Sequence, residues 1–233
     1  MTCVHMKRVL TVLLGLLACS SAFAADADVT GLVPTMRLTF DGGSLANTGS
    51  GTVKATPEGT ATYVTSTCGK ALDSSKFTPY GDLSGVFTAG HDAAIAVVAT
   101  LGAKANGIMI HFKNGDNHSV LLRRGAEAGT VVLTGKKSTT PLITATGVAD
   151  GDTAYHLYVA NILQDRIDLY IDGVFVGTTA TTTWSAGLVN FQLGSRHGSA
   201  LGGESKGGGT IFIAFFLSFI TALGQKSSIN PFG

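Results

Sequence analysis

The chain has 233 residues, a formal net charge of +1 and only 13% charged residues. With so little charge, and with no Lys/Arg stripe interleaved with aromatic residues, the sequence makes nucleic acid a poor candidate partner, and none is predicted. The length suits one domain. The 31 glycines among many Thr, Val, Ala and Ser residues, without clustered helix formers, favour an all-β domain rich in tight turns.

The first 24 residues are predicted to be a signal peptide. Lys7 and Arg8 form a short positive region, an apolar run follows over 9–17, and Ala22-Phe23-Ala24 fits the small-x-small cleavage rule. The apolar run is too short to span a bilayer, which needs about 20 residues. The predicted location is therefore secreted, or periplasmic and cell-envelope.

A second interpretation competes at the same end of the chain. Leu16-Leu17-Ala18-Cys19 is similar to a bacterial lipobox, in which Cys19 becomes a lipid-modified first residue. Ordinary cleavage after Ala24 is favoured because Leu17 is a less usual occupant of its position. That cleavage leaves Cys68 as the lone cysteine, so the predicted domain depends on its hydrophobic core and on no internal disulfide.

The rest of the chain predicts a succession of short strands. In chain order these cover 35–40, one or two segments within 52–67, then 93–100, 107–113, 118–124, 130–134, 142–146, 154–162, 166–172, 174–176 and 188–194. The segment 93–100 is apolar on both faces, as a central strand would be. About a dozen strands without helical interludes predict an all-β, two-sheet antiparallel jelly-roll sandwich, as one domain over 30–233.

The hairpin at 166–177 is the clearest local signal. Aliphatic and polar residues alternate over 166–171, which predicts one buried face and one face in water. Asp172-Gly173 supplies the two positive-φ positions of a tight turn, and Gly177 is expected to end the returning strand.

The segment 211–223 has no charged residue. The favoured interpretation is a last core strand that runs into a short helical turn. The alternative is a membrane-associating tail, although a helix of 13 residues would reach only about 20 Å.

The chain resembles the laminin-G-like, concanavalin A-like lectin/glucanase jelly-roll superfamily, in the variety common in secreted bacterial proteins. The matching pieces, in order, are Leu38-Thr39-Phe40-Asp41-Gly42, Gly69-Lys70-Ala71-Leu72-Asp73, Tyr155-His156-Leu157-Tyr158-Val159, the hairpin from Ile167 to Gly177, and Phe191-Gln192-Leu193-Gly194-Ser195. Their order and the Asp-Gly hairpin carry the resemblance. It implies the same sandwich fold over nearly the whole mature chain.

Catalysis is not predicted. Glucanases among these relatives carry Glu-x-Asp-x-Glu on one strand, because hydrolysis needs two carboxylates that face one bond. The glutamates of this chain, Glu58, Glu127 and Glu204, are isolated from one another. The nearest equivalent is the pair Asp168 and Asp172, for which a solvated hairpin edge is the favoured interpretation.

No cofactor is predicted either. Many relatives hold calcium with loop carboxylates and carbonyl oxygens. The loops at 114–117 and 150–152 are rich in Asn and Asp, but neither has enough ligands for a tight site alone. Turn formation by these side chains is the favoured interpretation.

Four residues are the candidates for ligand binding: Tyr80, Trp184, Arg196 and His197. Sugar recognition combines an aromatic face with planar polar groups that bind hydroxyls, and this set could line one rim of a sandwich. The alternative is that Trp184 and Tyr80 simply pack over the core. His111 and His156 lie within predicted strands and are expected to be structural.

Together these observations predict a secreted, non-catalytic domain that binds a carbohydrate or a surface glycoprotein. One alternative is a structural or adhesive cell-envelope protein without a small ligand, anchored by lipid on Cys19 or by insertion of the 211–223 tail. Another is a weak glycan-active hydrolase.

Overall fold

The structure is a computed structural model that describes residues 35–40, 43–52, 54–57, 60, 62–66, 69–75, 79–82, 93–114, 118–135, 142–148, 153–163, 166–180, 190–194 and 210–218. The predicted signal peptide over 1–24 lies outside these residues, and so does Cys68. Within the described residues, no helix is both long and apolar enough to cross a membrane.

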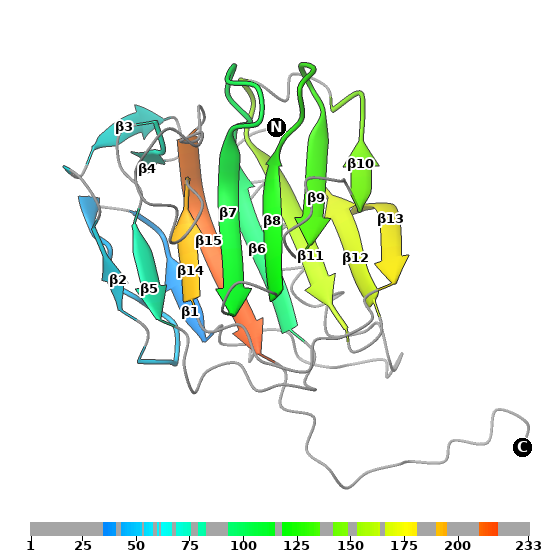
Figure 1. The fold of residues 1–233 in the computed structure, drawn as a ribbon. Helices are drawn as coiled ribbons and strands as arrows, with labels where there is room; N and C mark the ends of the chain where they lie inside the picture. The colour runs from blue at the N-terminus through cyan, green and yellow to red at the C-terminus, as the bar shows by residue number, and fades with distance from the viewer. Residues whose placement is uncertain are drawn as a thin grey trace, which may run out of the picture.

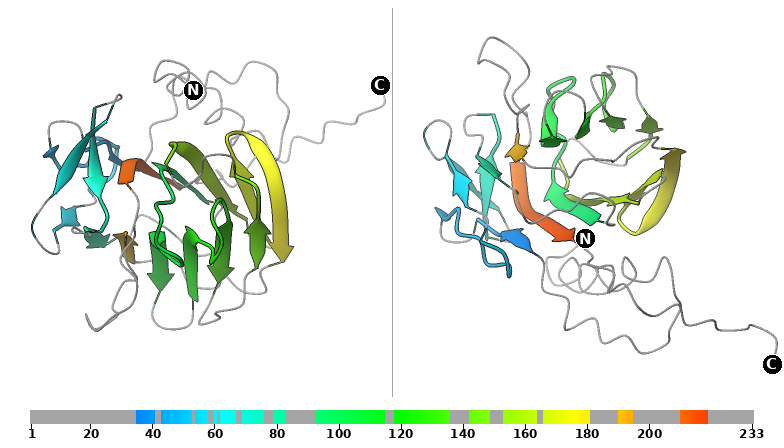
Figure 2. Two further views of the ribbon diagram at one scale, coloured as in Figure 1. Left: turned by 90° about the horizontal axis from the view of Figure 1, so that it is seen from above. Right: turned by 60° about the horizontal axis from the view of Figure 1, so that its bottom comes forward.

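Fifteen strands of the described residues form two antiparallel sheets that lie face to face (Figures 1 and 2). The eight-stranded sheet has the order β13 (Val174–Ala180), β12 (Arg166–Ile171), β11 (His156–Ile162), β6 (Ala93–Ala99), β15 (Thr210–Ser218), β4 (Gly69–Asp73) and β3 (Tyr63–Ser66), with β1 (Met36–Leu38) also paired to β15. The seven-stranded sheet has the order β10 (Ile143–Ala145), β9 (Val131–Gly135), β8 (His118–Arg124), β7 (Ile108–Asn114), β14 (Asn190–Leu193), β5 (Tyr80–Asp82) and β2 (Ala55–Thr56). The predicted all-β two-sheet sandwich is confirmed.

The core lies between the two sheets, where alternate residues of each strand meet. Ile95 and Val97 of β6 and Leu169 of β12 belong to one continuous buried cluster with Phe112 and Phe191 of the facing sheet. The rings of Phe112 and Phe191 pack with their centroids 6.2 Å apart. Because each large aliphatic or aromatic side chain contributes about 1.5–3 kcal/mol when buried, this layer accounts for much of the stability.

The hairpin between β12 and β13 forms as the sequence predicts. Asp172 and Gly173 have φ angles of 50° and 85°, the left-handed conformations that a two-residue hairpin turn requires. The predicted end of the returning strand at Gly177 is wrong, because β13 continues to Ala180. A bulge shifts the register between Leu169 and Tyr170, and beyond it Gly177 pairs with Leu169 inside the ladder.

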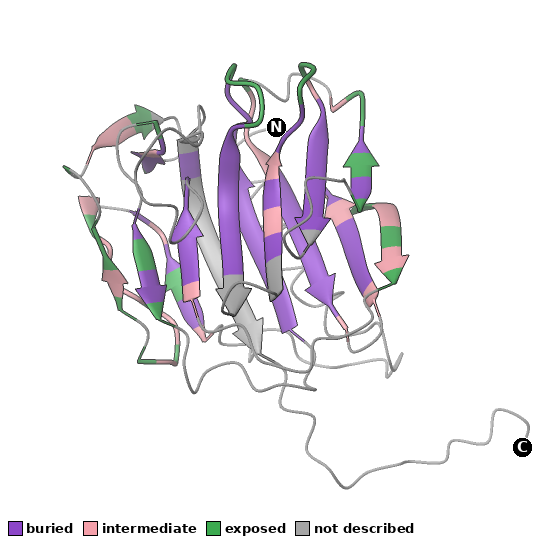
Figure 3. Ribbon diagram, in the orientation of Figure 1, coloured by how far each residue is buried: buried purple, intermediate pink, exposed green. Residues whose placement is uncertain are grey.

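The outer face of the eight-stranded sheet is buried over its central strands β6 and β11, whereas β13 at its edge is exposed or half-buried (Figure 3). The prediction that the polar face of the hairpin lies in water is therefore corrected for Asp168, while Arg166 and Tyr170 are half-buried. The outward residues of its central strands form a second apolar cluster: Ala71, Ala96, Val98, Leu157 and Val159, each at most 2% exposed. Asp168, which was expected at a solvated hairpin edge, is 6% exposed. The hairpin alone could not show this, because the apolar outward residues belong mostly to β6 and β11.

Two inner strands of the eight-stranded sheet also agree with the predictions from the sequence. All of β6 is buried, as predicted for a central strand. The start of the uncharged 211–223 segment is β15, a core strand that pairs with β6, β4 and β1. Residues beyond 218, where the helical turn was expected, lie outside the described part of the chain.

β4 and β5 are strands that the sequence did not predict, although 69–73 is part of the family resemblance. Both are short, and Tyr80-Gly81-Asp82 has the composition of a turn. Pairing with neighbouring strands, rather than local propensity, makes them strands.

Candidate ligand-binding face

Tyr80 is the one predicted ligand-binding residue that the structure describes. It lies in β5, where it pairs with Thr56 of β2 on one side and with Gln192 of β14 on the other. The next residue, Gly81, is buried, and a Cβ atom there would clash with the Phe191 ring. Since Gly81 faces the core, Tyr80 points away from it, and its side chain is 37% exposed.

Tyr80 is part of a row of residues that crosses six strands. The register continues from Gln192 to His111 of β7, then to Leu121 of β8 and Thr134 of β9. The strands of this row, from β2 to β9, lie side by side in Figure 1. We refer to Thr56, Tyr80, Gln192, His111, Leu121 and Thr134 as the polar row. At a strand spacing of about 4.8 Å it is roughly 24 Å long.

Three polar members of the row are shielded from water. Gln192, His111 and Thr134 are each at most 3% exposed, although they alternate with the core residues of their strands, and the apolar, half-buried Leu121 lies between His111 and Thr134. An amide, an imidazole and a hydroxyl can each donate and accept hydrogen bonds, and Tyr80 adds an aromatic ring between Thr56 and Gln192. These are the groups from which sugar-binding surfaces are built.

Charged residues flank the row without entering it. Arg123 lies two residues after Leu121 on β8, and its guanidinium donates a hydrogen bond to the Asn106 side chain. Asp82 lies two residues after Tyr80 on β5 and is exposed. The row itself contains no acidic or permanently charged side chain, which suits a neutral ligand better than an ionic one.

The other three predicted ligand residues, Trp184, Arg196 and His197, lie outside the described residues. The sequence did not identify Gln192 as a candidate, and it predicted a structural role for His111. A signal was present in both cases, because each is a single polar residue between apolar neighbours in a strand, at 110–112 and 191–193.

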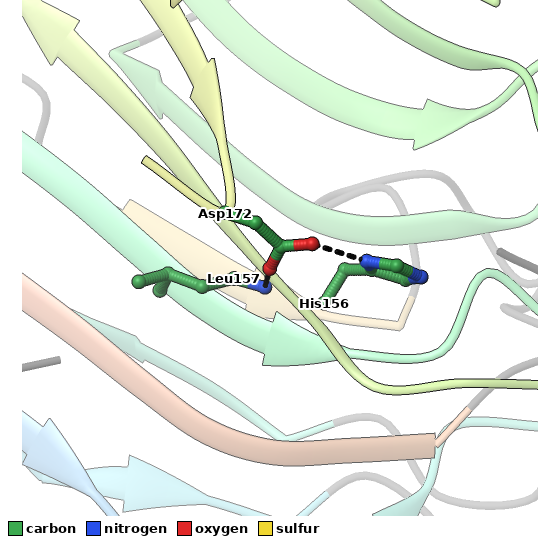
Figure 4. A network of polar contacts seen from close by, with 3 residues as sticks. All are labelled: His156, Leu157 and Asp172. Carbon is green, nitrogen blue, oxygen red and sulfur yellow. Dashed lines mark hydrogen bonds and ion pairs between the residues drawn. The ribbon is translucent and has the colours of Figure 1, made fainter. Parts of the chain in front are cut away.

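A second polar cluster, which serves the fold, holds the turn between β12 and β13 (Figure 4). The Asp172 carboxylate lies 2.5 Å from Nδ1 of His156 and accepts the backbone N–H of Leu157 at 2.9 Å. Burial raises the pKa of Asp172, but the hydrogen bonds from His156 and Leu157 outweigh it, so the pKa lies below its usual value. The prediction that His156 is structural is confirmed.

The carboxylates of Asp168 and Asp172 do not share one site. Asp168 accepts a hydrogen bond from Nε of Arg166 at 3.2 Å, whereas Asp172 is bonded to His156. Each carboxylate therefore has its own basic partner.

Among the described residues, no three His, Cys, Asp or Glu side chains gather closely enough to hold a metal ion. The loop positions 115–117 and 149–152, which include most of the Asn and Asp residues considered for calcium, lie outside those residues.

No protein-family model matches the sequence, and no curated protein is similar to it. Among solved structures, domain 4 of the extracellular arabinanase AbnA from Geobacillus stearothermophilus, in complex with arabinotriose, matches with a TM-score of 0.59 at 16% identity. The match covers 80% of this chain and 92% of that one.

Two botulinum neurotoxin structures are also similar. The serotype D/C binding domain gives a TM-score of 0.57 at 13% identity, over 79% of this chain and 48% of that chain. The DC binding domain in complex with rat synaptotagmin II gives a TM-score of 0.57 at 11% identity, again over 79% of this chain and 48% of that chain. This chain therefore spans about half the length of the toxin domains. At such low identities the likeness establishes the fold, a jelly-roll-like β-sandwich.

Proposed function

We propose that this chain is a secreted, non-catalytic domain that binds a neutral carbohydrate, free or carried by a surface glycoprotein, at the Tyr80 end of the polar row. The observation that carries the proposal is the exposed ring of Tyr80, which lies beside a row whose central side chains, Gln192 and His111, are polar although they are buried. A sugar stacks one face on an aromatic ring while its hydroxyls exchange hydrogen bonds with planar polar groups.

The similar structures support the class of ligand. The arabinanase domain was solved with arabinotriose, and one toxin domain was solved with synaptotagmin II. Location outside the cytoplasm rests on the leader-like first 24 residues. The separate basic partners of Asp168 and Asp172 support the non-catalytic part of the proposal, because a hydrolase needs two carboxylates that face one bond.

The test is a glycan array probed with the purified chain, followed by calorimetry with the best ligand and with arabinotriose. We expect saturable binding that Tyr80→Ala weakens about tenfold, since a lost stacking contact of about 1.4 kcal/mol has that effect. Thr144→Ala is the matched control, because Thr144 is exposed on β10 of the same sheet but lies off the polar row. Excess EDTA is expected to leave the affinity unchanged.

Two outcomes would contradict the proposal. One is the absence of binding to any glycan on the array at high protein concentration. The other is binding that Tyr80→Ala and Thr144→Ala affect equally, because the ligand would then lie elsewhere. Release of reducing sugar during the titration would contradict the non-catalytic part alone.

A further inference from the structure

One side of the sandwich, where the two sheets end at β10 and β13, carries no charged side chain. The two strands lie against each other, since a Cβ atom added at Gly177 of β13 would be 3.2 Å from the Ile143 side chain of β10. Figure 1 shows both strands at the same side of the molecule. The segments 142–148 and 174–180, which contain these strands, consist of uncharged residues alone. We refer to the two segments as the side edge.

The side edge is also apolar for a surface. Val174 and Phe175 are 67% and 54% exposed, and Leu142 is 39% exposed. Tyr80 is the one other large hydrophobic residue among the described residues that is exposed to this extent. Single exposed apolar side chains are ordinary, but three of them on one side of a molecule indicate an interaction surface.

β13 has an open edge. Among the described strands, β13 pairs with β12 and with no other (Figure 1). The backbone N–H and C=O groups that point away from β12 can therefore pair with a further strand. Proteins block such edges with lysine, proline, bulges or very short strands. β13 is seven residues long and contains no lysine and no proline, so its bulge is the one feature of this kind.

The opposite side of the sandwich is different. β3 and β2 end the two sheets there, and both have an exposed lysine beside them. Lys70 is directly opposite Thr65 of β3 in the register, and Lys54 precedes β2. Because lysines discourage pairing between edges, this side is protected. The absence of charge is therefore a property of the side edge and does not follow from the low charge of the whole chain.

We infer that the side edge is the contact surface between two copies of this chain, with β13 of one copy paired antiparallel to β13 of the other. The pairing joins the two eight-stranded sheets and covers Val174 and Phe175. A second copy suits this surface because an uncharged strand does not repel an identical one, and a net charge of +1 leaves little repulsion between whole chains. Identical antiparallel strands are related by a two-fold axis, so association ends at the dimer.

The test is sedimentation velocity of the full chain over a wide range of concentrations. We expect an equilibrium between monomer and dimer without larger species. Thr178→Lys should weaken the dimer about tenfold or more, because each copy then brings an ammonium group to the same interface. Added salt should restore part of the association of this variant by screening that repulsion. Phe175→Ala should also weaken the dimer about tenfold, because it removes a large apolar contact.

Thr65→Glu is the matched control, on the other edge strand of the same sheet. Thr178 and Thr65 are both exposed, and each new charge faces a charge of opposite sign on the neighbouring strand, Asp168 and Lys70 respectively. Neither substitution should therefore disturb the fold. The control should dimerise like the parent chain. Amide exchange of β13 should slow as the parent associates, and Thr178→Lys should abolish this protection.

Three results would overturn the inference. One is a chain that stays monomeric at every concentration, which would leave β13 without an identical partner. Another is a growing series of larger species, because two-fold pairing closes at the dimer. The last is association that Thr178→Lys and Thr65→Glu weaken equally, which would place the interface elsewhere. Tyr80→Ala should leave the dimer unchanged, so failure of the polar row and failure of this interface are distinguishable.

Discussion

Asp172 combines a backbone role with an electrostatic one. Its positive φ angle makes the turn between β12 and β13, and its carboxylate ties that turn to His156 and to the N–H of Leu157. Asn also tolerates a positive φ at this turn position, so Asp172→Asn keeps the backbone and removes the charge.

We expect Asp172→Asn to lower the free energy of unfolding by about 1 kcal/mol at neutral pH. A hydrogen bond to a charged group contributes about 1.5–3 kcal/mol, and partial exposure of Asp172 reduces this. Because the pKa of Asp172 is lowered from 3.8, its contribution is complete above that value and is lost as the pH falls through the folded pKa. Urea unfolding at neutral pH and in strong acid measures both effects. A difference between parent and variant that persists in acid would contradict the electrostatic explanation.

Gly81 sets how closely β5 can approach the core. A Cβ atom at this position would meet the Phe191 ring and would lie 2.7 Å from the carbonyl oxygen of Lys54. Gly81→Ala should therefore destabilise the fold by about 2 kcal/mol through overpacking. Thermal unfolding checks this, with Gly177→Ala as the control, because its new Cβ would lie 3.2 Å from the Ile143 side chain and meet no backbone. Equal melting temperatures for the two variants would show that β5 can move outward freely.

At the scale of the strands, the sequence predicted where strands form better than it predicted how deeply their side chains are buried. The alternation of 166–171 and the Asp-Gly turn are local signals, and both features appear in the structure. The burial of Asp168 depends instead on Ala96, Val98 and Leu157 of other strands, which no local pattern connects to the hairpin. The exposed Phe175 and buried Asn161 were unpredictable for the same reason.

The two-sided burial of β6 gives a paired prediction. Val97 faces the core and Val98 faces outward, yet the two are at most 1% exposed. Thr matches Val in shape but adds a hydroxyl, so Val97→Thr and Val98→Thr should each cost about 1–2 kcal/mol. Chemical denaturation of the two variants is the measurement. A sheet with one face in water would lose stability only with Val97→Thr, and that result would contradict burial of the outer face.

For the molecule as a whole, distant segments assemble both the sheets and the candidate site. The polar row contains Thr56 and Gln192, which are near opposite ends of the described chain. Strand prediction alone gives no register, so it could place Tyr80 on a rim but could not place it beside Gln192 and His111. Sites of this kind follow from topology, whereas hairpin turns follow from short motifs.

The position of β15 shows how far this assembly depends on the end of the chain. Although β15 is the last described strand, it lies inside the eight-stranded sheet, with β6 on one side and β4 and β1 on the other (Figure 1). A chain that ends at Gly209 would leave β6 unpaired along one edge and would remove Ile211 from the core. We expect it to lose cooperative unfolding entirely, because the sheet would be divided in two.

Ile211→Ala is a milder perturbation of the same strand. Ile211 is 1% exposed, and removal of a buried aliphatic side chain of this size costs about 2–5 kcal/mol. The variant should therefore melt cooperatively but at a lower temperature, while the shortened chain gives no transition in thermal circular dichroism. The shortened chain could instead melt cooperatively and give the spectrum of the full chain. In that case β15 is dispensable, and its place inside the eight-stranded sheet is wrong.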